Sequence, residues 1–213
     1  MEIYFVRHGE TEWNRQHMLQ GHSDIPLNDA GLAGARKAAR ALKDISFDRA
    51  FASPLARARR TAEIIASEHA GLKVEVNMDL IEMCFGKCEG LNLHKEELPE
   101  EEERLRQQLR RWFQDPEHAD PVPGGESVKE VKARCRHFLE TVIAPLEDHC
   151  ERILVVAHGG ILRSMEGVIR QEADQEFWNG PIAPNCGAMV CTMEKGKLQI
   201  RQLLDLVAMA SVF

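Results

Sequence analysis

Two histidines in the chain each follow a short apolar run and each precede a glycine. His8 comes after the run 3–6, and His158 comes after the run 153–157. An imidazole can act as a nucleophile or a proton carrier near neutral pH, because its ordinary pKa is about 6.5. The glycine that follows lets the backbone approach a ligand and leaves an N–H group to bind an oxyanion. The pattern predicts a site in which two imidazoles act on an anionic substrate.

Two arginines and a glutamate could complete such a site. Arg7 precedes His8, and Arg57 follows the run 49–53 at the start of an expected helix. Guanidinium groups donate paired hydrogen bonds to phosphate oxygens, and the start of a helix adds positive charge. Glu82, after a short strand and loop, is a candidate proton donor and acceptor. Phosphate is therefore the expected anion.

The elements that must position these side chains follow from the hydrophobic pattern. Apolar runs alternate with amphipathic helical patterns, which predicts a mostly parallel sheet with helices on both faces. Ligands of such a sheet bind beyond the carboxyl ends of its strands, where His8 and His158 stand. We predict a three-layer α/β/α fold in which a closing hairpin around 194–197 contributes one antiparallel strand. The expected strands are 3–6, 49–53, 74–76, 153–157, 187–193 and 198–204. The expected helices are 28–42, about 55–68, 127–146 and one that starts near Ile161.

Two of the expected helices carry recognisable start signals. Asn28 is a typical N-cap residue, and Ser127 with Glu130 matches the S-x-x-E capping box. The polar stretch between His8 and Asn28, which contains Gly21, is expected to be a loop.

The segment 89–125 differs from the rest of the chain. It holds an acidic run, a basic cluster and then three prolines. A charged run of this kind indicates a solvated helix face. Its place between core elements also suits a helical cap over the pocket. We therefore expect one domain over residues 1–213, with a cap insertion at about 89–125.

Composition limits the classes of function. The chain has 213 residues, 44% of them hydrophobic, and a net charge of −7, which argues against broad binding to nucleic acid or to anionic membranes. The sequence has no membrane-length apolar stretch and no export signal, so a cytoplasmic location is expected. Six cysteines without a CxxC pair are expected to be reduced thiols.

Six short motifs resemble those of the histidine phosphatase superfamily, the phosphoglycerate mutase-like proteins. They occur in the family's order and cover nearly the whole chain, so chance is a poor explanation. The motifs are Arg7-His8-Gly9-Glu10-Thr11-x-x-Asn14, Gln20-Gly21-x-x-Asp24-x-Pro26-Leu27, Ser53-Pro54-Leu55-x-Arg57-Ala58, Leu80-x-Glu82-x-x-Phe85-Gly86-x-x-Glu89-Gly90, Gly124-Gly125-Glu126-Ser127 and Val156-Ala157-His158-Gly159-Gly160.

The resemblance implies a role for each matched residue. His8 would be the nucleophile that becomes phosphohistidine, and Glu82 would protonate the leaving oxygen and then activate water. Cationic side chains would take the place of a metal, so neither a metal nor another cofactor is expected. The phosphoryl oxygens would be bound by Arg7, Arg57 and His158, and further substrate contacts would come from Asn14, Gln20, Gly21 and the N–H of Gly159.

Within the family the main alternatives are a phosphatase and a cofactor-dependent phosphoglycerate mutase. The region 84–90 resembles the phosphatase branch, and Arg110-Arg111 is followed by Trp112-Phe113 rather than by the mutase pattern. We therefore expect hydrolysis of a small phosphorylated metabolite, although Arg110 and Arg111 could overturn this. Cys88 replaces an aromatic residue common in the phosphatases. Sugar phosphates, glycerate derivatives, nucleotides and α-ribazole phosphate all stay open as substrates.

Two other classes of function were weighed. A metal-dependent hydrolase could use His8, His17, His22 and His158, but no acidic cluster or HxxxH spacing supports it. A catalytically silent phosphate-binding module is disfavoured because His8, Glu82 and His158 are all present. The apolar C-terminal run 206–213 could pack on its own domain or be buried in a homodimer.

Overall fold

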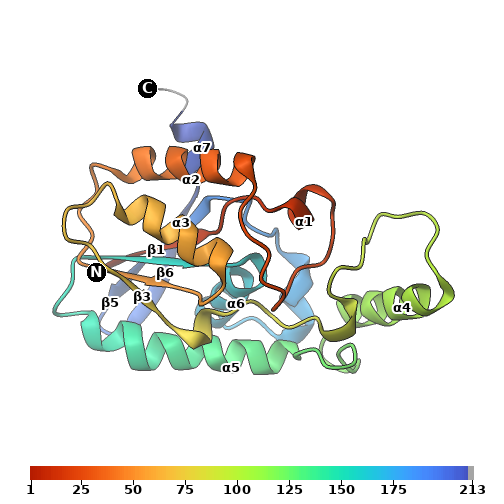
Figure 1. Ribbon diagram of the computed structural model, residues 1–213. Coiled ribbons are helices and arrows are strands. Elements are labelled where there is room, and N and C mark those ends of the chain that lie inside the picture. Colours follow the sequence, from red (N-terminus) through yellow and green to blue (C-terminus); the bar gives the residue numbers. More distant parts are fainter. Residues whose placement is uncertain (211–213) are drawn as a thin grey trace.

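A computed structural model describes residues 1–210 of the chain, and its centre is a six-stranded sheet (Figure 1). The strand order is β3-β2-β4-β1-β5-β6. β5 is antiparallel to both of its neighbours, whereas the pairs β3-β2, β2-β4 and β4-β1 are parallel. The predicted mostly parallel sheet with one antiparallel strand is therefore confirmed. The strands are β1 Glu2–Arg7, β2 Arg49–Ala52, β3 Val74–Val76, β4 Arg152–Ala157, β5 Gly187–Glu194 and β6 Lys197–Asp205.

Helices cover both faces of this sheet and make it three-layered (Figure 1). α2 (Asp29–Leu42) and α3 (Ala56–Ala66) pack on one face, and α5 (Val128–Phe138) and α6 (Gly159–Arg170) pack on the other. Alternate side chains of β1 and β4 enter two separate hydrophobic cores. Both faces of these strands are thus buried, which is why their sequences are continuous apolar runs.

The predicted helix starts agree with the structure. The Asn28 side chain accepts a hydrogen bond from the Gly31 N–H, and Ser127 and Glu130 form a reciprocal capping box. The long helix predicted to reach Leu146 is helical throughout, but its α geometry ends at Phe138. A π-helical turn and then a 3₁₀ turn follow, and Pro145 in the latter has no N–H to continue an α-helical ladder.

Two short helices fall where the pattern indicates none. The stretch after His8 was expected to be a loop, yet α1 (Glu12–Arg15) forms there because Thr11 and Asn14 cap each other reciprocally. So short a helix has no apolar period to detect. α7 (Leu206–Met209) occupies part of the apolar C-terminal run, and its Leu206 is buried in the core beside α2. The rest of that run, 211–213, lies outside the described residues.

α4 (Glu100–Gln114) forms from the charged segment and lies on the side of the molecule where α1 lies (Figure 1). The interpretation as a solvated face holds for Arg110 and Arg111, which are exposed. It is wrong for Arg106 of the basic cluster, which is buried, and the inner face of the helix places Leu109 and Trp112 in the core. The apolar residues of α4 lie at helical spacing between charges, so the charge run concealed an amphipathic helix.

Two further findings bear on the expectations. All six cysteines are free. Over residues 1–210, no helix combines the length and the apolar character needed to cross a membrane.

Candidate active site

The two strand-end histidines lie beside each other at one edge of the sheet. Arg7 of β1 pairs with Ala157 of β4, so the residues that follow stand at the same level. The His8 N–H donates to the Ala157 carbonyl (3.0 Å), and the imidazole ring centres of His8 and His158 are 5.1 Å apart. Both side chains are buried. The register of two adjacent parallel strands therefore brings together residues separated by 150 positions in sequence.

The His8 ring is held in one orientation and one tautomer. Its Nδ1 lies 2.7 Å from the carbonyl oxygen of Gly9, which can only accept, so Nδ1 carries the proton. Nε2 is then left with its lone pair. Burial, and after it the charges of Arg57 and Arg7, hold the pKa of His8 well below the ordinary value. The ring is therefore neutral, the form that a nucleophilic histidine requires.

His158 stands directly before α6 and contacts Ser53 at the end of β2. Its Nε2 is 2.6 Å from Ser53 Oγ, while its Nδ1 is buried without a hydrogen-bond partner among residues 1–210. Burial and the charge of Arg57 lower the pKa of His158 well below the ordinary value, so this ring is also neutral. An unpartnered buried nitrogen beside the His8 ring is an open position for a polar ligand atom.

Arg57 is fully buried and holds the loop that precedes it in sequence. It donates to the carbonyls of Ser23 (2.8 Å) and Gly21 (2.7 Å). The amide oxygen of Gln20 accepts from its Nη1 and Nε at 3.1 Å each, with the amide nitrogen toward Thr11 Oγ1. Burial lowers the pKa of Arg57 to about 10, against the opposing charge of carboxylates nearby. Arg57 therefore remains a cation at neutral pH.

Arg7 reaches the same edge of the sheet from the end of β1. Its Nη1 donates to the Ala183 carbonyl at 2.6 Å, and its Nε is buried with no hydrogen-bond partner in the described part of the chain. A side chain on Gly159 would come within 3.5 Å of the Arg7 guanidinium, so the start of α6 lies against this cation. Burial lowers the pKa of Arg7.

Glu82 presents its carboxyl group to the start of α6. Oε1 accepts from the Met83 N–H (2.8 Å), and Oε2 accepts from the Gly160 N–H (3.0 Å). The side chain is buried, and this burial raises the pKa of Glu82 despite the hydrogen bonds and the arginine charges. A raised pKa favours the protonated form that a proton donor needs.

The predicted substrate-binding residues separate into two groups. Asn14, Gln20 and Gly159 line a cleft of about 580 Å³ together with Arg7, His8 and Glu82. Gly21, Arg57 and His158 lie behind this surface rather than on it. Asn14 Oδ1 is 3.2 Å from the Asn185 amide nitrogen, which also donates to the His8 carbonyl (3.0 Å).

The outer part of the cleft is apolar and poor in cations. Among the residues of 1–210 that line it, Arg7 is the one guanidinium, and lysine is absent. Cys88, Arg110 and Arg111 do not line it. Its apolar wall consists of Met18, Leu19, Phe85, Leu93, Phe113, Trp178 and Ile182.

The metal-site hypothesis finds no support in the arrangement of the histidines. The His17 ring lies against His94, with ring centres 4.9 Å apart, and His22 Nε2 donates to the Glu82 carbonyl. The part of the chain that the structure describes has no group of three or more side chains suited to hold a metal ion.

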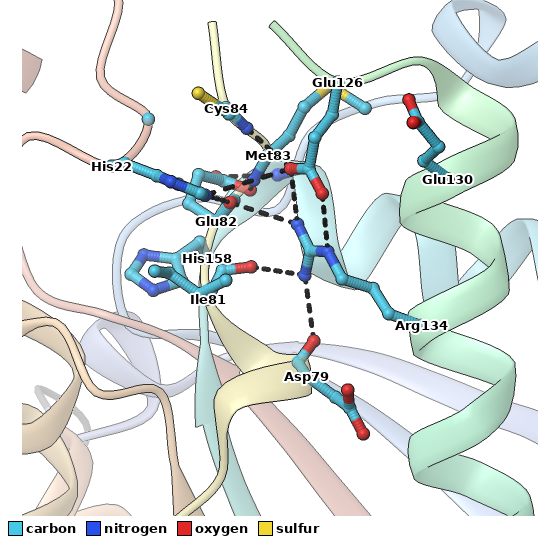
Figure 2. Close-up of polar contacts among 12 residues, drawn as sticks. His22, Asp79, Ile81, Glu82, Met83, Cys84, Glu126, Glu130, Arg134 and His158 are labelled. Carbon is cyan, nitrogen blue, oxygen red and sulfur yellow. Dashed lines mark hydrogen bonds and ion pairs between the residues drawn. The ribbon is translucent and has the colours of Figure 1, made fainter. Parts of the chain in front are cut away.

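Sequence reasoning singled out neither Asn185 nor Arg134. Asn185 lies in a loop without periodicity, so the chain around it carries no signal. Arg134 is one arginine among many on a helix, yet it donates to the segment that carries Glu82 (Figure 2). The one hint in the sequence would be a position on the inner face of α5, where an arginine can reach other parts of the backbone.

Comparisons with known proteins agree with this geometry. A family model described as the histidine phosphatase superfamily (branch 1) matches residues 3–206. Phosphoglycerate mutase-like protein 4 of Arabidopsis thaliana is 37% identical over 166 residues, which is 77% of this chain and 69% of that protein. A 2,3-bisphosphoglycerate-dependent phosphoglycerate mutase of Methylocella silvestris is 36% identical over 76% of this chain and 78% of its own length.

Solved structures share the fold over nearly the full length. The α-ribazole phosphatase of Shigella flexneri superposes with a TM-score of 0.81 at 27% identity, covering 95% of this chain and 96% of its own. A phosphoserine phosphatase of Entamoeba histolytica, solved with 3-phosphoglyceric acid, has a TM-score of 0.79 at 22% identity over 97% and 98% of the two chains, a likeness of fold alone. The chain therefore belongs to the histidine phosphatase superfamily, with a mostly parallel α/β/α fold, and is a phosphoryl-transfer enzyme.

Proposed function

We propose that the protein hydrolyses a small phosphomonoester through a phosphohistidine on His8. The observation that carries this proposal is the hydrogen bond from His8 Nδ1 to the Gly9 carbonyl, which leaves the Nε2 lone pair for attack. Nε2 forms a bond to phosphorus as the ester P–O bond breaks, and Glu82 gives its proton to the departing oxygen. Glu82 then takes a proton from water as that water attacks phosphorus and releases His8 with inorganic phosphate.

Unpartnered donors around His8 suit the oxygens of the transferring group. Arg7 Nε and His158 Nδ1 are buried and have no hydrogen-bond partner among the residues that the structure describes. When Ser53 Oγ–H donates to His158 Nε2, Nδ1 carries the proton and can donate to a phosphoryl oxygen. The Gly159 N–H at the start of α6 adds a donor at the positive end of a helix, and Asn14 adds an amide. Such donors stabilise the charge on the transferring oxygens in the transition state.

Arg57 supports the same group from behind the cleft. Four of its N–H groups bind Gln20, Gly21 and Ser23, and a guanidinium has five, so one is left for a phosphoryl oxygen. Its positive charge also acts on the reacting centre without a direct contact.

Water is the favoured acceptor of the phosphoryl group because the cleft has few cationic side chains that could bind a second anionic group. A mutase must hold a substrate that carries a carboxylate and two phosphates during its cycle. The described cleft wall has one guanidinium, and Arg110 and Arg111 are exposed on α4 away from it. The mutase names of relatives at 36–37% identity keep phosphoglycerate mutase as the second candidate.

The same wall favours a substrate whose alcohol part is apolar or aromatic. Phe85, Phe113 and Trp178 line the cleft, and Trp178 has its ring centre 4.7 Å from that of Phe113. Leu93, His94 and Phe113 come from the segment 89–125, in agreement with its proposed role as a cap.

Trapping of the intermediate tests the proposal. Wild-type protein, quenched during turnover of a phosphomonoester, should carry one phosphoryl group on His8, and His8→Ala should carry none. Inorganic phosphate should be released from one preferred ester in a panel that includes 3-phosphoglycerate with and without 2,3-bisphosphoglycerate. Isomerisation of 3-phosphoglycerate without phosphate release would establish the mutase instead. Turnover that persists in His8→Ala would exclude both.

A further inference from the structure

A partly buried arginine that does not line the cleft binds the backbone around Glu82. We propose that Arg134, paired with Glu126, is a positioning residue for Glu82, the proton carrier of the hydrolysis; this inference rests on the proposed function. Arg134 lies on α5, and Figure 2 shows it between the segment 79–82 and Glu126.

Arg134 binds three carbonyl groups of the short segment that ends at Glu82. Its Nη1 donates to the carbonyls of Asp79 (2.9 Å) and Ile81 (2.5 Å), and its Nη2 donates to the carbonyl of Glu82 (3.1 Å). Residues 81–84 belong to no helix, strand or β-bridge. Backbone hydrogen bonds of regular structure therefore do not hold Glu82 in place, and Arg134 supplies fixed contacts instead.

Glu126 completes the arrangement on the other side. Its Oε1 accepts from Arg134 Nε (3.0 Å), and its Oε2 accepts from Arg134 Nη2 (2.9 Å) and from the Cys84 N–H (2.8 Å). The Glu126 N–H donates back to the Cys84 carbonyl at 2.9 Å. The backbone is thus held on both sides of Glu82, before it by Arg134 and after it by Glu126.

All five N–H groups of Arg134 are occupied by these contacts, two of them by a bidentate pair with Glu126. A lysine has the charge but not the planar fork, so it cannot reach the three carbonyls and the carboxylate together. Glu126 offsets the charge of the guanidinium, and the role that we assign to Arg134 is geometric. The held backbone aims the Glu82 carboxyl at the start of α6, where it accepts from Gly160.

Leaving-group dependence separates this role from general damage to the fold. Protonation by Glu82 matters when the leaving oxygen is a poor leaving group, as in an alkyl phosphate, and matters little for p-nitrophenyl phosphate. A displacement of about 1 Å can cost ~10²-fold in rate. For Arg134→Lys we expect kcat/KM to fall about 10²-fold with an alkyl phosphate and less than about 10-fold with p-nitrophenyl phosphate. Arg136→Lys, an exposed arginine on the same helix, is the matched control and should leave both values unchanged.

A double-mutant cycle provides the second measurement. If Arg134 acts through Glu82, Arg134→Lys should cause no further loss with the alkyl phosphate in a chain that already carries Glu82→Gln. Equal losses with both substrates, or losses that add fully to those of Glu82→Gln, would overturn the proposal. Glu126→Gln should show the same selective loss and serves as the test if Arg134→Lys does not fold. A wild type with no phosphohistidine on His8 would instead refute the proposed function itself.

Discussion

The carboxyl group of Glu82 accepts a hydrogen bond from the Gly160 N–H at 3.0 Å, two residues after His158. The carboxyl is therefore attached to the start of the helix that the second histidine precedes. A negative group at a helix start is stabilised, which opposes the rise in the pKa of Glu82 that burial causes. This hydrogen bond links the position of the Glu82 carboxyl group to the start of α6, and a substitution at Gly160 tests the link.

Gly160→Ala should reduce catalysis more than stability. A Cβ at this position would lie 2.7 Å from Glu82 Oε1, the mobile end of a side chain, so the carboxyl can move aside. We expect kcat to fall about 10- to 100-fold, since a small misplacement of a catalytic group is costly, with little change in melting temperature. The measurements are steady-state kinetics and thermal unfolding of the same preparation.

Gly31→Ala provides the contrasting control for that variant. Its Cβ would come within 2.0 Å of the Glu10 carbonyl oxygen, which belongs to the backbone and cannot turn away. We expect a fall of at least about 2 kcal/mol in the free energy of unfolding, typical of a forced overlap in packed structure. Equal stability losses in the two alanine variants would contradict the assignment of the Gly160 effect to Glu82.

Phe113→Ala should change substrate preference at the apolar wall. The Phe113 ring lies against Trp178, and stacking on a substrate ring is worth about 0.5–1.5 kcal/mol. We expect KM for benzyl phosphate to rise about 3- to 10-fold, whereas glycerol phosphate should be nearly unaffected. Both substrates have alkyl leaving oxygens, so their chemistry is similar. Leu203→Ala, an exposed truncation on β6, is the control, and a uniform effect on both substrates would count against an aromatic-binding wall.

The pH profile of kcat/KM should be bell-shaped for an alkyl phosphate. His8 must be neutral, and its lowered pKa keeps it so well below pH 6.5; activity is lost when the pH falls through that pKa. Glu82 must be protonated, and its raised pKa keeps the carboxyl group protonated above pH 4.5. Activity is lost when the pH rises through the pKa of Glu82. Glu82→Gln should lower the rate about 10²- to 10⁴-fold and remove the alkaline limb. An unchanged alkaline limb would show that another group titrates there.

Protein stability should decline at acid pH because of the buried histidines. His8 and His158 stay neutral in the folded chain below pH 6.5, where the unfolded chain binds protons. Each histidine lowers the free energy of unfolding by up to about 1.4 kcal/mol per pH unit as the pH falls below about 6.5. Urea unfolding across this range should show a shallower decline for His158→Gln than for wild type. Parallel curves for the two proteins would disprove the expected linkage.

The sequence indicates which residues the sheet brings together because the strongest patterns in the chain lie next to them. The runs that end before His8 and His158 are buried on both faces, and burial produces continuous apolar strands that are easy to recognise. The parallel sheet then places both strand ends at one edge. Arg57 was expected at the same edge and is there, although it lies behind the cleft and holds a loop.

The contacts that aim Glu82 could not be predicted in the same way. Arg134 donates to backbone carbonyls, and every residue has a carbonyl. The residue type of the acceptor therefore gives no sign of the interaction in the sequence. The same holds for Asn185, whose amide binds the His8 carbonyl. The charged face of α4 was expected, but the burial of Arg106 was not, because charge dominates the composition and only the spacing reveals the inner face with Leu109 and Trp112.

The parallel pairing of β1 with β4 has a kinetic consequence. It joins residues 150 positions apart in the sequence, such as Glu2 and Arg152, and contacts of such long sequence separation form slowly because the entropy of closing the intervening loop must be overcome first. A slip of one residue in this register would turn every side chain of the strand to the opposite face and separate the two imidazoles. Recovery of phosphohistidine formation during refolding will therefore report when the long-range pairing of β1 with β4 is complete.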